Sequence, residues 1–366
     1  MLRDWARKPL QDTERLLITP TRRMVYSGML PGWIEGLYRR EELEIDLLPL
    51  AAAAGVRVVS GEVAGLDPDR RQLRLADGTT LHYDLLSLAV GGELDLTSFT
   101  GTEALLPIRP IEAFFEAWRA LEQAQAARIA VVGGGAAGTE LALAIATKLC
   151  RGRGRARVTL IAGAAGLMEG HPPSVRRRSR AALAQRGVEI FETDATTGPH
   201  GLELTGVGAL QSDAVVVATG RTPPGWLAMT GLMLGPGGGV AIGADMRSLS
   251  HPSVWAAGDV SERPDRPLAR SGVHAVKSGP ILAANLRSAV EGGAIRRYDP
   301  PSRTLYLLST GGRRAILSWG GLAMEGAWVW RLKNWIDRRF VTRYQHWGVT
   351  GGVGRANQSD CEIGDS

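Results

Sequence analysis

One glycine-rich run constrains the fold of this chain more than any other feature of its 366 residues. Residues 128–132 predict a buried strand, and Gly133-Gly134-Gly135-Ala136-Ala137-Gly138 follows it directly. Residues 139–149, which are rich in alanine and leucine, then predict a helix. A strand, a glycine-rich turn and a helix in this order are typical of the βαβ unit that binds a dinucleotide.

Each glycine of this loop has its own physical reason. Gly133 permits the tight turn from strand to helix, Gly135 lets a pyrophosphate approach the backbone, and Gly138 lets the helix pack closely on the strand. The phosphate then lies at the positive end of the helix dipole, on free N–H groups. Glu140 ends the motif and is a further cofactor-binding candidate. The alternative, a purely structural glycine turn, is disfavoured by the flanking strand and helix.

The sequence leaves open which nicotinamide nucleotide is bound. An acidic residue at the end of the second strand would accept a hydrogen bond from the ribose of NADH. That strand, residues 157–161, is followed by Ala162-Gly163 and no acid. The run Arg176-Arg177-Arg178 could meet the 2′-phosphate of NADPH, but such runs are more often solvated helix faces.

Two further strands end in residues suited to nucleotide binding. Residues 213–220 predict an apolar strand that ends in Gly220, and residues 253–259 predict one that ends in Gly258-Asp259. A carboxylate at the carboxyl edge of such a sheet can accept hydrogen bonds from a sugar hydroxyl. A strand ending in Gly-Asp is common by itself, so its significance comes from its place after Gly220 in the chain.

The remaining pattern predicts an α/β protein. Asp77-Gly78 between two alternating runs predicts a hairpin, and residues 84–90 predict a strand buried on both faces. A helix over residues 113–127 would bury Phe114 and Trp118 on one face. Other strands are expected at 16–19, 56–59 and 188–191, and other helices at 174–186 and 273–290.

The order of these motifs resembles flavoproteins that carry two dinucleotide-binding domains. These are the pyridine nucleotide-disulfide oxidoreductases and the type II NADH dehydrogenases, and the resemblance covers residues 12–292. Residues 255–259 are similar to the second flavin motif of this family, in which the aspartate binds the ribitol. A narrower resemblance is to a branch found fused ahead of selenophosphate synthetase. It lies in residues 26–32, 272–276 and 330–340.

This resemblance implies an α/β fold with two Rossmann-like domains. The FAD-binding domain is then discontinuous, in residues 1–112 and 223–292, and the NAD(P)-binding domain covers residues 113–222. Residues 293–366 form a helical and stranded addition. The cofactors implied are FAD and NAD(P)H. The reaction implied is hydride transfer from NAD(P)H to FAD, followed by electron transfer to a quinone or another small acceptor.

The resemblance assigns binding residues rather than catalytic ones. Gly220, Gly258 and Asp259 would hold the nucleotides together with the glycine loop, and the reaction requires neither a catalytic side chain nor a metal. The disulfide reductases of the family need a cysteine pair beside the flavin, and the corresponding residues 26–32 contain none. The only two cysteines of the chain lie far apart in the sequence. Disulfide reduction through a dithiol is therefore not expected.

A second departure from the family lies at the amino end. The family begins with a strand and a glycine-rich loop for the FAD pyrophosphate, whereas residues 2–10 correspond to the helix that follows that loop. The missing strand would be central in the flavin sheet. Its roughly four or five buried apolar side chains, at ~1.5–3 kcal/mol each, would sum to as much as the ~5–15 kcal/mol margin of a typical domain. We therefore expect either an upstream start of translation or a weakened, flavin-free remnant that binds a nucleotide or a partner.

The net charge and the carboxyl-terminal residues indicate which partners the protein could bind. The net charge of +6 is compatible with phosphates, acidic lipid or nucleic acid, and it does not select among them; we expect a small-molecule acceptor and no nucleic acid. Residues 326–344 place Val329, Leu332, Ile336 and Phe340 at helical spacing beside basic residues. This pattern fits a helix docked on the protein itself or on a homodimer partner, or one lying on an anionic membrane. We expect a cytoplasmic protein, peripheral at the inner membrane in the latter case, with a disordered tail over the last dozen residues.

Overall fold

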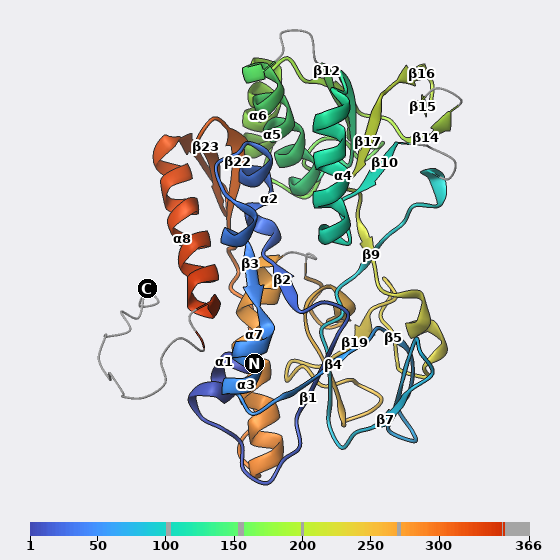
Figure 1. Ribbon diagram of the computed structural model, residues 1–366, viewed down its shortest axis with the longest axis vertical. Coiled ribbons are helices and arrows are strands. Elements are labelled where there is room, and N and C mark those ends of the chain that lie inside the picture. The colour runs from blue at the N-terminus through green and yellow to red at the C-terminus, as the bar shows by residue number, and fades with distance from the viewer. Residues whose placement is uncertain (100–103, 153–156, 199–200, 269–271, 346, 348–366) are drawn as a thin grey trace.

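The computed structural model describes residues 1–99, 104–152, 157–198, 201–268, 272–345 and 347. Figure 1 shows two halves, with the glycine-loop half at the top, the other half below it, and the carboxyl-terminal strands beside the glycine-loop half. Helix α8 (Ala327–Gln345) runs along one side of the molecule. The tail expected to be disordered, together with Cys361, lies outside the described residues.

A parallel five-stranded sheet forms the upper half, in the order β10-β17-β11-β12-β13. Its strands are β10 (Leu105–Pro107), β11 (Arg128–Val132), β12 (Arg157–Ile161), β13 (Glu189–Phe191) and β17 (Ala214–Val217). The helices of this half are α4 (Ile111–Ala124), α5 (Ala136–Gly152) and α6 (Pro173–Gln185). The strand, glycine loop and helix follow one another as predicted, and this half is a Rossmann-like domain.

The apolar face of α4 packs into the hydrophobic core of this half. Phe114 and Trp118 are almost fully buried, and Leu121 is half-buried, so the predicted helix face is confirmed. A small antiparallel sheet follows β13, and the sequence pattern did not predict it. Its strands are β14 (Ala195–Gly198), β15 (Gly201–Leu204) and β16 (Gly208–Gln211).

The lower half is the second Rossmann-like unit, and most of its small sheets pack around one hydrophobic cluster. The β2-β3 sheet and α2 pack instead in the hydrophobic cluster of the upper half. Its paired strands are β1 (Leu16–Thr19) with β4 (Arg57–Ser60), β2 (Arg23–Val25) with β3 (Glu44–Asp46), β8 (Leu86–Leu88) with β20 (Val254–Ala256), β9 (Glu93–Leu94) with β18 (Arg221–Thr222), and β19 (Val240–Ala241) with β21 (Ser261–Glu262). The sheet β5 (Val63–Asp67), β6 (Gln72–Leu75) and β7 (Thr80–His82) is antiparallel. Its helices are α1 (Leu2–Arg7), α2 (Leu30–Ile34), α3 (Leu47–Ala53) and α7 (Gly272–Glu291).

The hairpin predicted at Asp77-Gly78 joins β6 to β7 and is confirmed. Gly78 has a φ of +88°, which glycine adopts without a steric penalty. The side chain of Asp77 accepts a hydrogen bond from the backbone N–H of Thr79 at 2.9 Å. The turn is therefore fixed by backbone conformation and by a local side-chain acceptor.

The strand predicted over residues 84–90 is shorter and less buried than expected. It reduces to β8, in which Leu88 is buried but Leu86 and Ser87 are half-buried. The reason is its pairing, because β8 has β20 as its only partner among the described strands. The parallel pairs β1-β4 and β8-β20 thus form two separate sheets. The sequence predicts that the family's first strand, which would be central in the flavin sheet, is missing, and this stays a prediction.

The carboxyl-terminal addition is a three-stranded meander followed by α8. Strands β22 (Leu305–Gly311), β23 (Arg314–Trp319) and β24 (Leu322–Gly326) pair antiparallel, and the meander packs against α5 and α8. None of the described helices is long and apolar enough to cross a membrane.

The buried stripe of α8 differs from the predicted one. Its buried residues are Val329, Lys333, Asp337 and Val341, whereas Leu332, Ile336 and Phe340 are only half-buried. The predicted stripe is confirmed at Val329 only, because Lys333 and Asp337 pair with each other in the interior and turn their side of the helix inward. The helix docks on its own chain, with the ring of Phe340 4.6 Å from the ring of Tyr26.

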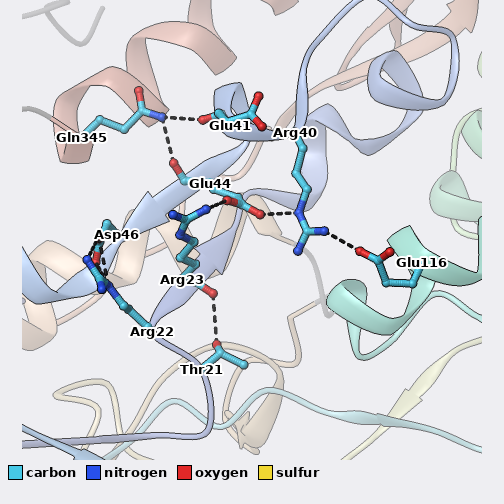
Figure 2. Close-up of polar contacts among 9 residues, drawn as sticks. All are labelled: Thr21, Arg22, Arg23, Arg40, Glu41, Glu44, Asp46, Glu116 and Gln345. Atoms are coloured by element: carbon cyan, nitrogen blue, oxygen red, sulfur yellow. Dashed lines mark hydrogen bonds and ion pairs between the residues drawn. The ribbon is translucent and has the colours of Figure 1, made fainter. Parts of the chain in front are cut away.

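Polar contacts around Glu44 join the two halves to α8 (Figure 2). The buried carboxylate of Glu44 accepts hydrogen bonds from Arg23 at 2.7 Å and from Arg40 at 2.6 Å. Arg40 also reaches Glu116 of α4 at 2.7 Å. The side-chain amide of Gln345, at the end of α8, donates to the carbonyl of Glu44 at 2.8 Å. One strand of the lower half therefore holds both α4 and α8 in position.

Candidate functional site

The glycine loop has the geometry of a phosphate cradle. A Cβ on Gly133, whose φ is +134°, would overlap the carbonyl of Ala218, and a Cβ on Gly138 would overlap the carbonyl of Gly133. By contrast, a Cβ on Gly135 would meet no atom within 4 Å. Gly133 and Gly138 are therefore needed for packing, whereas the side of Gly135 is open to a ligand at the start of α5.

Glu140 lies in the second turn of α5, two residues after the last glycine of this loop. Its carboxylate accepts a hydrogen bond from the backbone N–H of Ser309 in β22 at 2.6 Å. Burial raises the pKa of Glu140 to about 7, although Lys333 nearby and the Ser309 N–H favour the ionised form. A glutamic acid whose pKa is raised towards neutrality can both hold and release a proton.

Lys333 and Asp337 form a buried ion pair next to Glu140. The Nζ of Lys333 lies 2.7 Å from Asp337 and donates to the carbonyl of Gly28 at 2.8 Å. Burial lowers the pKa of Lys333, but the charges of Asp337 and Glu140 more than offset this effect, and the pKa is raised. Lys333 therefore stays an ammonium in the interior.

Tyr26 completes this cluster from the lower half. Its hydroxyl donates to Asp337 at 3.2 Å. Burial and the neighbouring charge of Asp337 raise the pKa of Tyr26, so the phenol stays protonated. We refer to Tyr26, Glu140, Lys333 and Asp337 together as the buried charge cluster. It lies against residues 26–32, the stretch in which the family resemblance would place a cysteine pair.

A second polar group lies at the end of β20, where Gly258 has a φ of +78°. Asp259 follows it and forms an ion pair with Arg221, which comes directly after Gly220. Arg109 lies close to both, and burial together with the charge of Arg221 lowers its pKa. The predicted residues Gly220, Gly258 and Asp259 are thus brought together, from one strand end of each half.

A pocket extends from Asp259 along the start of α7. It is lined by Asp259, Ser261, His274 and Tyr298, among others. The Nδ1 of His274 lies 3.3 Å from the hydroxyl of Tyr298, and burial together with Lys277 lowers the pKa of His274. The oxygen atoms of Asp259 and Ser261 suit a ligand that carries hydroxyl groups.

Sequence reasoning missed Tyr26, Lys333, Asp337 and Arg221 as parts of these two groups. The i,i+4 spacing of Lys333 and Asp337 was the available signal, because such a pair can neutralise itself on a helix. Arg221 directly follows a predicted strand end, which was a signal too. Nothing in the sequence pairs Tyr26 with residues more than 300 positions away.

The comparison with protein families decides what this arrangement belongs to. The family described as pyridine nucleotide-disulphide oxidoreductase matches residues 5–279. The chain belongs to this family. Members of the family are NAD(P)H-dependent flavoprotein oxidoreductases that use FAD, and the chain is an enzyme of that class.

Individual relatives are distant. Ferroptosis suppressor protein 1 of Taeniopygia guttata is 27% identical over 268 residues, which are 69% of this chain and 68% of that protein. The demethylphylloquinone reductase NdbB of Synechocystis is 25% identical over 335 residues, or 86% of this chain and 81% of that protein. The solved sulfide:quinone oxidoreductase of Aquifex aeolicus shares the fold, with a TM-score of 0.77 at 16% identity over 95% of this chain and 89% of that one.

The glycine loop predicts opposite results for two alanine substitutions. Gly135→Ala should leave the melting temperature unchanged and weaken NADH binding at least about ten-fold, because the added methyl group occupies the approach of the pyrophosphate. Gly138→Ala should destabilise the protein by at least about 2 kcal/mol through its overlap with Gly133. Thermal unfolding and calorimetric titration measure both effects. Unchanged NADH affinity in Gly135→Ala would contradict this description of the loop.

Proposed function

We propose that this enzyme oxidises a nicotinamide nucleotide and passes the electrons to a quinone. The observation that carries the proposal is the buried charge cluster. It lies where a disulfide reductase of the family would have its cysteine pair, and it offers proton-carrying groups instead of thiols. An acceptor that takes up protons together with electrons fits such groups better than a disulfide does.

The residues present fit both nucleotides. We propose that residues 113–222 hold the nicotinamide nucleotide through Gly133, Gly135 and Gly138, and that residues 1–112 and 223–292 hold FAD through Gly258 and Asp259. Bound FAD supplies the hydride-accepting and electron-donating chemistry. The protein's own part is to place the nucleotides and to hold the protons.

The proton requirement follows from the acceptor. A quinone becomes a hydroquinone by taking two electrons and two protons. Burial raises the pKa of Glu140 to about 7, so this carboxyl can carry a proton near neutral pH. Lys333 remains charged beside it and can stabilise negative charge that develops on an oxygen atom. A quinone acceptor is supported by one relative, a demethylphylloquinone reductase, and by one protein of the same fold, a sulfide:quinone oxidoreductase.

Activity measurements with two acceptors test this function. The purified chain should be yellow, NADH or NADPH should bleach it, and a soluble quinone should be reduced. Lys333→Met should slow quinone reduction at least about ten-fold and leave ferricyanide reduction nearly unchanged, since ferricyanide takes up no proton. Arg331→Met, which removes an exposed cation from the same helix, is the matched control and should affect neither rate.

Two results would contradict the proposal. A colourless, folded protein would refute a flavin-dependent reaction and favour a flavin-free nucleotide-binding protein. Equal loss of quinone and ferricyanide reduction in a well-folded Lys333→Met variant would show that Lys333 serves electron entry or structure rather than the quinone.

We further propose that α8 and the meander meet an anionic membrane, from which a lipid-soluble quinone would reach the site. Trp328 and Trp335 are 46% and 57% exposed on α8, and Arg339 lies over the ring of Trp335 at 5.5 Å. Trp319 and Leu322, which are paired across β23 and β24, are also exposed. Exposed tryptophans beside arginines suit the interface between water and lipid headgroups.

Vesicle binding tests the membrane proposal. Replacing Trp328 and Trp335 together by serine should weaken binding to anionic vesicles several-fold, because it removes the aromatic contacts with the interface. Met229→Ser is the control, since Met229 is 83% exposed on the 3₁₀ turn Gly225–Met229, outside this surface. Unchanged binding in the double variant would contradict the proposal. So would a dimer that buries these tryptophans and leaves vesicles unbound.

A further inference from the structure

The carboxyl end of β12 is the place where a dinucleotide-binding fold distinguishes NADH from NADPH. An acidic residue there accepts a hydrogen bond from the ribose 2′-hydroxyl, and it disfavours the 2′-phosphate of NADPH. In this chain β12 ends at Ile161, and Ala162, Gly163 and Ala164 follow. None of these residues carries a charge.

The next strand of the sheet supplies a carboxylate at this position. Asp194 lies three residues after the end of β13, which pairs with β12. Its Oδ1 accepts a hydrogen bond from the backbone N–H of Ala164 at 3.0 Å. A Cβ on Gly163 would lie 3.5 Å from the same oxygen. The carboxylate of Asp194 therefore occupies the space that an acidic side chain at position 163 would reach.

Residues 162–168, whose backbone Asp194 contacts, are held against the glycine loop. The backbone N–H of Met168 donates to the carbonyl of Gly134 at 2.7 Å. A Cβ on Gly134 would lie only 2.8 Å from the Cβ of Ala162, so the two segments are in close contact. Because β11, β12 and β13 run parallel, Asp194 lies at the same edge of the sheet as the glycine loop.

Several of the neighbouring charged groups already have partners within the protein. The backbone N–H of Leu167 and the guanidinium of Arg180 donate to Glu192, each at 2.8 Å. These two contacts lower the pKa of Glu192. Arg176 donates to the carbonyl of His171 at 3.2 Å, and Arg178 lies 3.5 Å from Glu325 in β24. Two arginines of the run considered for a 2′-phosphate are thus directed to other partners.

We propose that Asp194 selects NADH over NADPH by accepting a hydrogen bond from the ribose 2′-hydroxyl and repelling a 2′-phosphate. This inference rests on the proposed binding of a nicotinamide nucleotide at the glycine loop. A 2′-phosphate carries about −1.5 to −2 charges at neutral pH. Next to the Asp194 carboxylate it would meet a like charge, whereas a hydroxyl group would meet an acceptor.

Calorimetric titration of the full chain with ADP-ribose and with 2′-phospho-ADP-ribose tests this, without dependence on enzyme activity. The wild-type chain should bind ADP-ribose at least about ten-fold more tightly. Asp194→Asn keeps an oxygen acceptor for the Ala164 N–H and removes the charge, so the two dissociation constants should approach each other. Asp213→Asn is the control. Asp213 accepts from the N–H groups of Ala127 and Arg128 at the opposite end of the same sheet, and its substitution should leave the ratio unchanged.

The outcomes separate this inference from the function on which it rests. Binding of both ligands with a ratio that Asp194→Asn does not change would overturn the role of Asp194 and leave nucleotide binding intact. Tighter binding of 2′-phospho-ADP-ribose by the wild-type chain would also overturn it. Failure of the folded wild-type chain to bind either ligand would refute the proposed nucleotide site itself.

Discussion

An ammonium group buried in a protein stays charged only if acceptors and counter-charges surround it, and Lys333 imposes this requirement on three separate parts of the chain. Asp337 and the carbonyl of Gly28 satisfy its charge and its donors. Asp337 in turn accepts from Tyr26. These contacts fix α8 against the lower half and bring the carboxyl-terminal addition to the start of α5, where the Ser309 N–H meets Glu140.

The nucleotide-binding segments and the proton-carrying side chains are therefore separate parts of the structure. The glycine loop and the strand end at Asp259 offer backbone geometry and single polar groups, which suit the binding of nucleotides. The buried charge cluster offers protons, and its members come from the amino-terminal part, the glycine-loop helix and α8. A change in how α8 packs therefore alters the proton-carrying groups, even where it touches neither nucleotide-binding segment.

Local patterns in the sequence predicted the local parts of this arrangement. The glycine loop, the hairpin at Gly78 and the aromatic face of α4 each depend on residues close together in the chain, and all are found as predicted. Helical periodicity selected Leu332, Ile336 and Phe340 for the buried face of α8, because a charge pattern does not reveal that Asp337 neutralises Lys333 in the interior. The carboxylate beside Gly163 was missed for a related reason. It belongs to the following strand, and only the pairing of β12 with β13 brings Asp194 there.

The pH dependence of NADH-driven quinone reduction tests the central claim most directly. Because the pKa of Glu140 is raised to about 7, its proton is present below that pH and is lost above it. The wild-type rate should therefore fall as the pH rises through about 7, and Glu140→Gln, which cannot titrate, should give a lower and flat rate over the same range. A fall near this pH that persists in Glu140→Gln, with the variant folded as well as the wild type, would contradict the assignment of Glu140 as the proton-carrying group.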